Sequence, residues 1–218
     1  LTSRRAKVLR PLRSSFERYG EVFVSLGVSF VPNFVSLYDE GVGDEGLYSE
    51  LTPPKSSGER WIGVAPFAKH KGKIYPLDRM EKVVSKLSEE SRVKIFLFGS
   101  GDREREILSL WRERYPGVIS LADKRYGFAV ELSLMSRLDV MISMDSANMH
   151  LASLVEVPVV SVWGATHPYC GFLGWRQSDS GVVELPLDCR PCSVFGNKPC
   201  YRKDYACLEI APETIVDR

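Results

Sequence analysis

Short apolar runs alternate with longer amphipathic segments through the middle of this chain, and this rhythm restricts the fold more than any other feature. The apolar runs predict strands, and the segments between them carry apolar residues at helical spacing. The expected strands cover residues 61–66, 93–98, 118–121, 140–142 and 157–163, and the expected helices cover residues 77–87, 103–115 and 127–138, with one more around His150. Strands and helices that alternate in this way predict an α/β protein, with a parallel sheet and helices on both faces.

The first 60 residues do not share this rhythm. Residues 21–38 (EVFVSLGVSFVPNFVSLY) are apolar and β-rich, and residues 39–60 are rich in Gly, Pro, Ser and Glu. Because one or two strands cannot bury an apolar face alone, we expect residues 21–38 to be part of a larger body. The composition of residues 39–60 is that of a linker.

Positive charge is concentrated in residues 1–20, which contain one acid, Glu17, and the basic residues Arg4, Arg5, Lys7, Arg10, Arg13 and Arg18. One interpretation is a solvated helix and turn beside a domain boundary. The other is a patch facing anionic lipid or a phosphorylated acceptor. Over the whole chain the net charge is +1, which gives no reason to expect nucleic acid as a partner. No apolar run approaches the roughly 18–20 residues that span a bilayer.

Polar loops follow the expected strands. Right-handed crossovers place these loops on one edge of a parallel sheet, where ligands bind against helix N-termini. The first loop contains Lys69, His70, Lys71 and Lys73, which suit a diphosphate because lysine acts as a point charge on phosphate oxygens. We expect Lys73, close to a helix start, to make the phosphate contact, and Lys69 and Lys71 to be solvated.

The second loop begins at Gly99 and continues through Ser100, Gly101, Asp102 and Glu104. Small residues after a strand allow a ligand to approach the backbone, and a carboxylate here could accept hydrogen bonds from a ribose or an adenine amino group. An ordinary turn with Asp102 as the helix N-cap explains the same residues equally well.

The third loop contains Asp145, Ser146, Ala147 and Asn148, and His150 follows about one helical turn later. Asp145 could be a simple N-cap, but consecutive small residues at a helix start expose backbone N–H groups and form an anion site. The fourth loop, residues 164–168, could contact the sugar or cover the site. No catalytic triad or pair of carboxylates is apparent.

Four of the five cysteines cluster near the end of the chain with the spacing C-x2-C-x7-C-x6-C; they are Cys189, Cys192, Cys200 and Cys207. Four thiolates at such spacings could hold a structural zinc ion. Reduced thiols and two disulfides are the alternatives. The first 169 residues contain no cysteine, which argues against a secreted disulfide scaffold. None of these interpretations makes the cluster catalytic.

From Trp61 onward the chain resembles the C-terminal domain of glycosyltransferase family 9, the ADP-heptose:lipopolysaccharide heptosyltransferases. Residues 73–76 (KIYP) resemble the family's lysine-x-aromatic-proline element, and residues 98–104 resemble its glycine turn with a following glutamate. Residues 145–150 are similar to its aspartate, small residues and histidine. Residues 159–168 are similar to its hydrophobic strand ending in glycine and threonine, and the cysteine-rich tail is also familiar from many members.

The resemblance implies a GT-B glycosyltransferase, in which two Rossmann-like domains enclose the active site. Residues 1–50 would then be a remnant of the N-terminal acceptor domain with its linker, and residues 51–218 the domain that binds the nucleotide-sugar donor. The implied donor-binding residues are Lys73 at the phosphates, Glu104 near the ribose, Asp145 ordering its turn, and Gly99, Ser146, Ala147, His150 and Thr166. Ala147 stands where many members have glycine.

The resemblance also implies the reaction, an inverting transfer of a heptose-like sugar from an ADP-sugar to a lipopolysaccharide core acceptor. The general base would lie in the N-terminal domain, so no catalytic residue is assigned, and no metal cofactor is required. The implied location is cytoplasmic, with peripheral contact at the inner membrane as an extension. Two alternatives stay open: a nucleotide-binding module without turnover, and another GT-B enzyme such as a nucleotide-sugar epimerase.

Overall fold

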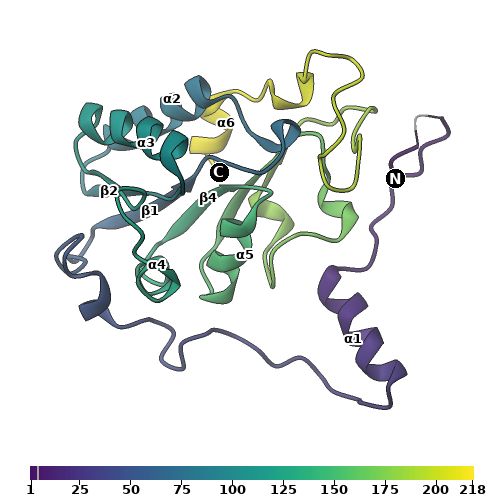
Figure 1. Cartoon of the computed structure of the whole chain (residues 1–218), viewed down its shortest axis with the longest axis horizontal. Helices are drawn as coiled ribbons and strands as arrows, with labels where there is room; N and C mark the ends of the chain where they lie inside the picture. The colour runs from purple at the N-terminus through teal and green to yellow at the C-terminus, as the bar shows by residue number, and fades with distance from the viewer. Residues whose placement is uncertain (4) are drawn as a thin grey trace.

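An open sheet of six parallel strands forms the centre of the molecule (Figure 1). The computed structural model describes residues 1–3 and 5–218, so Arg4 lies outside the described residues. Parallel pairing joins neighbouring strands in the order β3-β2-β1-β4-β5-β6. The strands are β1 Arg60–Ala65, β2 Val93–Leu97, β3 Val118–Ser120, β4 Val140–Met144, β5 Val159–Trp163 and β6 Val182–Glu184. This is the strand order of a Rossmann fold, and it reverses between β1 and β4.

Helices cover both faces of the sheet. The side chains of β1 alternate between two cores, with Ile62 and Val64 in one and Trp61 and Ala65 in the other. The first core contains side chains of α2 Leu77–Ser88, α3 Asp102–Arg114 and α6 Pro212–Val216, and the second contains side chains of α4 Phe128–Met135 and α5 Ala147–Leu154. The prediction of an α/β protein with a covered parallel sheet is therefore confirmed.

Two regular elements at the C-terminal end were not predicted from the sequence. Strand β6 has three residues, of which only Val183 is fully buried, and α6 has five. Segments this short do not carry enough residues to establish a period of 2.0 or 3.6. Five 3-10 helices complete the described structure: Glu45–Tyr48, Lys71–Lys73, Pro168–Cys170, Asp179–Gly181 and Ala206–Leu208.

The N-terminal segment differs from the β-rich expectation for residues 21–38. Within the described chain, no strand precedes β1, and the helix α1 Ser15–Ser25 occupies the first part of this stretch. A capping box begins the helix, because the Glu17 N–H donates to Ser14 Oγ and the Ser14 N–H donates to Glu17 Oε2. The β-branched composition is overridden here because the segment has no neighbouring strand to pair with.

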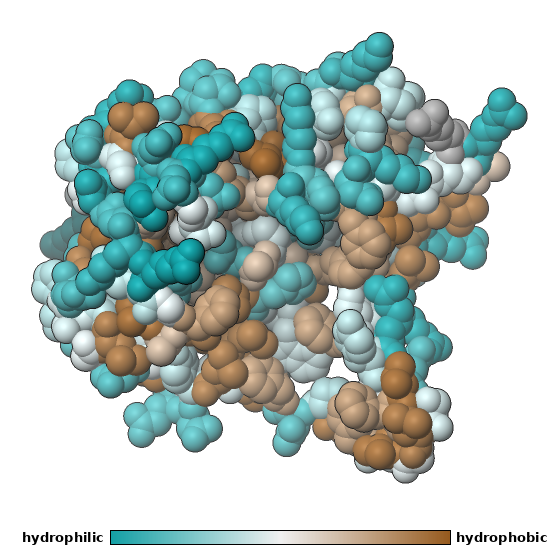
Figure 2. All heavy atoms as spheres, viewed as in Figure 1, coloured by the Kyte–Doolittle hydropathy of each residue, from teal (hydrophilic) through white to brown (hydrophobic). Residues whose placement is uncertain are grey.

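Helix α1 stands apart from the sheet and buries none of its residues (Figure 1). Figure 2 shows apolar side chains gathered on this separate lobe. The exposed apolar side chains of residues 15–31 are Tyr19, Val22, Phe23, Val24, Leu26, Val28, Phe30 and Val31.

The chain reaches the α/β domain before the boundary expected at residues 50 and 51. The Leu37 N–H donates to the Leu154 carbonyl at 2.8 Å, and the Gly43 N–H donates to Ser136 Oγ at 2.8 Å. Tyr48 is fully buried and packs edge-on against Trp61. The first half of the proposed linker, residues 39–60, thus already contacts the domain. Among the described residues, no helix has both the length and the apolar character to cross a membrane.

Candidate functional site

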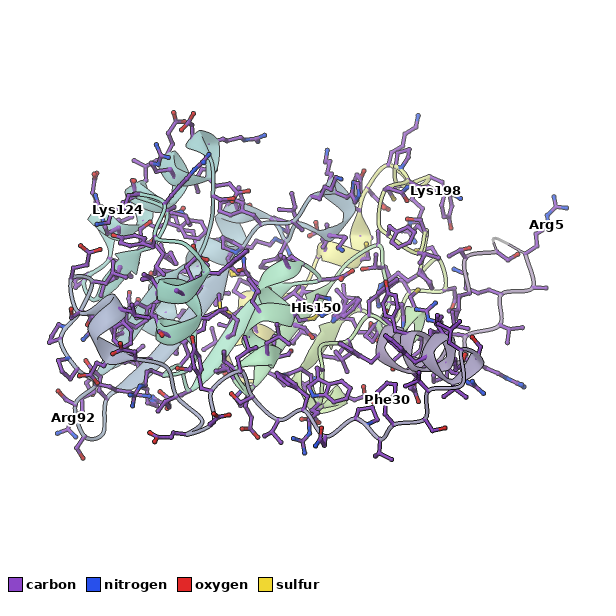
Figure 3. All side chains as sticks on the ribbon, turned by 60° about the horizontal axis from the view of Figure 1, so that its bottom comes forward. Arg5, Phe30, Arg92, Lys124, His150 and Lys198 are labelled. Carbon is purple, nitrogen blue, oxygen red and sulfur yellow. The ribbon has the colours of Figure 1, made fainter. Side chains whose placement is uncertain are left out.

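A pocket of about 680 Å³ opens at the carboxyl edge of the sheet, where the strand order reverses. Ligands of open α/β sheets bind at this position. The loops after β1, β2 and β4 supply much of its lining: Lys69, Lys73, Gly99, Ser100, Glu104, Asp145, Ser146, Ala147, Asn148 and His150. Lys69, which we expected to be solvated, is exposed and lies at this pocket as well. Figure 3 shows His150 near the middle of the molecule, between Lys124 beyond β3 and Lys198 in the C-terminal segment.

Three of the predicted residues meet at one carboxylate oxygen. Lys73 Nζ lies 3.0 Å from Asp145 Oδ2, and the Thr166 hydroxyl donates to the same oxygen at 2.8 Å. Asp145 and Thr166 are buried, whereas the Lys73 side chain keeps 16% of its surface exposed. Thr166 therefore lies behind the carboxylate and does not line the pocket. Lys73 reaches solvent, so its ammonium group can donate to a ligand and to Asp145 together.

The start of α5 faces the same pocket. Ser146 is the N-cap residue with extended backbone, but its side chain makes no capping hydrogen bond with the helix. Its hydroxyl lies 3.3 Å from that of Ser143 instead. Ala147, the first helical residue, is exposed. Because the first backbone N–H groups of a helix lack partners inside the helix, this end of α5 is suited to hold an anion.

His150 lines the pocket one turn into α5 and is half-buried. Burial lowers the pKa of the His150 imidazole; Asp145 opposes this change, and Lys73 adds to it. The ring is therefore neutral near pH 7, with one nitrogen able to donate and the other able to accept a hydrogen bond. Such a group can contact a phosphate oxygen or a sugar hydroxyl.

The glycine turn after β2 is closed by its own glutamate. Glu104 Oε2 accepts a hydrogen bond from the Ser100 N–H at 2.8 Å. A Cβ at Gly99 would lie 2.8 Å from Leu108, 3.1 Å from Glu104 and 3.3 Å from Phe67, so only glycine lets these three side chains close around the turn. Glu104 lines the pocket with its second oxygen free of this bond.

Asp102, the other acidic residue of this turn, lies outside the pocket. It is the first residue of α3, with Gly101 as the N-cap, so it is not the N-cap. Its side chain is 91% exposed and pairs with Arg105 at 3.2 Å. Asp102 does not line the pocket, which leaves Glu104 as the carboxylate of this loop that does.

Several pocket residues are not indicated by the sequence pattern. One group is apolar and aromatic: Phe67, Phe98, Leu121, Phe128, Phe172, Val194 and Phe195. Phe172, Val194 and Phe195 come from irregular segments after β5, whose path has no periodic signal. The hydrophobic pattern marks residues such as Phe98 as core, and it does not distinguish core from pocket wall.

Glu131 is the other pocket residue that the sequence does not indicate. It lies in the first turn of α4, and its carboxylate has no hydrogen-bond or ion-pair partner among the residues that the structure describes. Burial raises the pKa of the Glu131 carboxyl above its ordinary value. A half-buried acceptor without a partner is available to a ligand. Neighbouring Val130 and Leu132 give this position the appearance of an ordinary helix residue in the sequence.

The clustered cysteines are free thiols. Burial raises the pKa of the Cys207 thiol to about 11, and the neighbouring thiols of Cys192, Cys189 and Cys200 contribute in the same direction. In the described part of the chain, no three His, Cys, Asp or Glu side chains form a group that could hold a metal ion. A structural zinc ion at these four cysteines stays a prediction.

Residues 44–200 match the model of glycosyltransferase family 9 (heptosyltransferase). The chain belongs to this family. Within glycosyltransferase family 9, it is 25% identical over 166 residues to lipooligosaccharide heptosyltransferase 2 of Campylobacter jejuni serotype O:2, a match that covers 74% of this chain and 50% of the relative. The serotype O:6 protein of the same name is 24% identical over 165 residues, with 74% of this chain and 51% of the relative covered. The chain spans about half the length of these curated relatives.

Solved structures of family members share the fold. The family 9 glycosyl transferase from Veillonella parvula superposes with a TM-score of 0.70 at 18% identity, covering 97% of this chain and 60% of that one. The E. coli heptosyltransferase WaaC with ADP-2-deoxy-2-fluoro heptose superposes with a TM-score of 0.63 at 18% identity, covering 98% and 57%. These matches confirm the Rossmann-like fold that the resemblance implied.

Proposed function

We propose that this chain supplies the donor-binding half of an inverting glycosyltransferase, which transfers a heptose-like sugar from an ADP-sugar to a lipopolysaccharide core acceptor. The observation that carries the proposal is one pocket in which Lys73 pairs with Asp145 beside the uncapped start of α5. A lysine ammonium and free helix N–H groups are the partners that phosphate oxygens take. The relatives support the donor, since WaaC was solved with an ADP-heptose analogue.

The chemistry in this proposal is electrostatic. The acceptor hydroxyl attacks the anomeric carbon of the sugar, the bond from that carbon to the diphosphate oxygen breaks, and ADP departs. Lys73 and the N-terminus of α5 neutralise the charge that develops on the leaving diphosphate. The base that takes the hydroxyl proton lies outside this chain, in the acceptor domain. None of these steps by this chain's residues requires a metal cofactor.

The nucleoside occupies the apolar end of the pocket in this proposal. Phe98, Leu121 and Phe128 line the pocket and offer apolar surface to a base. Two carboxylates lie in reach of the same pocket, those of Glu104 and Glu131. Carboxylates accept hydrogen bonds from ribose hydroxyls and from an adenine amino group. Gly99 contributes by leaving the space in which Glu104 closes the turn after β2.

We also propose that the enzyme works at the cytoplasmic face of the inner membrane, where its lipopolysaccharide acceptor would be anchored. The support is the combination of basic residues in the N-terminal segment, such as Arg5 and Arg10, with the exposed apolar side chains of α1. A polar face and an apolar face together favour attachment to an anionic lipid surface.

Calorimetric titration with ADP, and with UDP, GDP and CMP as controls, tests the donor assignment. We expect ADP to bind and the other nucleotides to bind at least tenfold more weakly. If another nucleotide binds more tightly than ADP, the donor carries that nucleotide instead. If none of the four binds, the proposal is contradicted. Incubation with ADP-heptose separates the alternatives: release of ADP by this chain would exclude a nucleotide-binding module without turnover, and isomerisation of the sugar would indicate an epimerase.

A further inference from the structure

We propose that Arg190, in the cysteine-rich segment, is a positioning residue of the donor site, which holds the loop after β5 so that Thr166 fixes Asp145 against Lys73. The inference rests on the proposed binding of a nucleotide-sugar diphosphate at Lys73. Arg190 contacts no pocket atom itself; it lies behind the site and acts through the loop formed by residues 164–166.

Arg190 is 2% exposed, and its guanidinium group donates four hydrogen bonds. Its Nε donates to the Gly164 carbonyl at 2.5 Å, and its Nη2 donates to the Thr166 carbonyl at 2.9 Å. Its other bonds go to the Leu185 carbonyl at 2.7 Å and to Glu184 Oε2 at 2.7 Å. The Arg190 side chain thus forms hydrogen bonds with both ends of the loop, residues 164 and 166, and connects this loop to the end of β6.

The loop that Arg190 contacts is part of the proposed phosphate site, because Thr166 contacts the Lys73–Asp145 ion pair. The Thr166 hydroxyl donates to Asp145 Oδ2 at 2.8 Å, and the same oxygen lies 3.0 Å from Lys73 Nζ. Ala165 lies between the two residues whose carbonyls Arg190 contacts. Its N–H donates at 2.7 Å to the carbonyl of Gly72, the residue before Lys73. The loop that Arg190 contacts therefore acts on Lys73 in two ways: Ala165 holds the preceding residue, Gly72, and Thr166 holds Asp145, the partner of the ammonium group.

The segment that follows Arg190 packs against Lys73 and the loop after β5. The Cys192 N–H donates to the Ala165 carbonyl at 2.8 Å. A Cβ at Gly196 would lie 2.6 Å from Lys73 Cγ and 3.3 Å from Thr166 Cγ2, so this glycine rests on the lysine stem. Phe195 beside it lines the pocket. The cysteine-rich segment is thus part of the donor-site wall, and Arg190 anchors its first end.

An arginine is required for this role because of its geometry. The planar guanidinium carries several donors in fixed directions, so it can serve three carbonyls and a carboxylate at once, which the single ammonium of lysine cannot match. Loss of the side chain would leave the carbonyls of Gly164 and Thr166 without these donors. The loop would then be free to move away from Asp145, and Lys73 would lose its fixed orientation.

The test is a double-mutant cycle measured as ADP affinity by calorimetry, with the variants Arg190→Gln, Lys73→Ala and the combination of both. If Arg190 acts through Lys73, Arg190→Gln should weaken ADP binding about tenfold in the natural chain and about twofold or less in the Lys73→Ala background. Arg190→Lys should restore only part of the affinity. The control is Arg79→Gln, because Arg79 also holds the C-terminal tail, at the Ile210 carbonyl, but does not touch this loop.

A melting curve of each variant accompanies the binding measurement. If Arg190→Gln does not fold, Thr166→Val replaces it in the same cycle, because it removes only the hydroxyl that contacts Asp145. Equal weakening in both backgrounds, or no weakening of ADP binding by either variant, would overturn the positioning role while the donor function stands. Failure of the natural chain to bind ADP would instead overturn the donor function, and the role of Arg190 with it.

Discussion

Lys73 and Asp145 form an ion pair of 3.0 Å although they follow different strands, β1 and β4, on the two sides of the point where the strand order reverses. The carboxylate is buried and also accepts a hydrogen bond from the Thr166 hydroxyl, so two side chains fix its position. The ammonium group has three donors and uses one of them here. It can keep Asp145 and still contact phosphate oxygens, which makes the pair a preformed half of a binding site.

Replacing Lys73 by alanine should weaken ADP binding by about 1–3 kcal/mol, the range for losing a hydrogen bond to a charged group. The variant should also melt at a lower temperature, because Asp145 then stays buried without its cation. Calorimetry and a melting curve measure the two effects separately. Lys71→Ala is the matched control, since the Lys71 ammonium lies over the Tyr205 ring. An equal loss of affinity in the control would contradict the assignment.

Replacing Gly99 by alanine should lower the free energy of unfolding by about 1–3 kcal/mol, as overpacking of a closed site does. The added methyl group would press on Leu108 at 2.8 Å and on Glu104 at 3.1 Å. Because Glu104 closes the turn, ADP affinity should fall as well. Denaturant titration provides the measurement. Gly20→Ala in α1 meets only Phe30 at 3.9 Å and should leave stability unchanged or slightly raised.

Glu131 should make stability depend on pH. Burial raises the pKa of its carboxyl above the ordinary 4.5, so the folded state holds this proton more tightly than the unfolded state does. Its contribution to stability is complete below the ordinary pKa and is lost as the pH rises through the raised pKa. Glu131→Gln should therefore be more stable than the natural chain at pH 7 and equal to it near pH 4. An unchanged difference across this range would contradict the prediction.

His150 should have the opposite dependence. Burial lowers the pKa of its imidazole below 6.5, so the unfolded state takes up a proton at a higher pH than the folded state does. Its contribution to stability is present above pH 6.5 and is lost as the pH falls through the lowered pKa. His150→Gln should lose less stability than the natural chain between about pH 6.5 and 5. Melting temperatures at several pH values test this, and parallel curves for the two proteins would count against it.

The sequence was sufficient for five of the six strands and for one side of the site. Alternating periods located β1 to β5, and the rule that parallel strands end at one edge correctly predicted that Lys73, Glu104 and Asp145 share a pocket. These predictions depend on local patterns and on topology. They do not require knowledge of how side chains pack.

The other side of the site could not be predicted, because it is formed mostly by segments outside the helices and strands. Arg190 lies between two cysteines in a segment without hydrophobic periodicity. Nothing in that sequence indicates that its guanidinium group donates hydrogen bonds to the loop after β5. Glu131 could not be identified because its position in α4 gives no sign of pocket exposure. Thr166 was identified from the family resemblance, and the structure places it behind Asp145 rather than at the pocket surface.

The shortness of the two outer strands has a consequence for how this molecule resists aggregation. Strands β3 and β6 have three residues each, so each border of the sheet offers only a few unpaired N–H and C=O groups to another chain. The strongly apolar strands β4 and β5 lie inside, paired on both sides. Edge strands this short offer another polypeptide too few free backbone groups to pair with them as an additional strand.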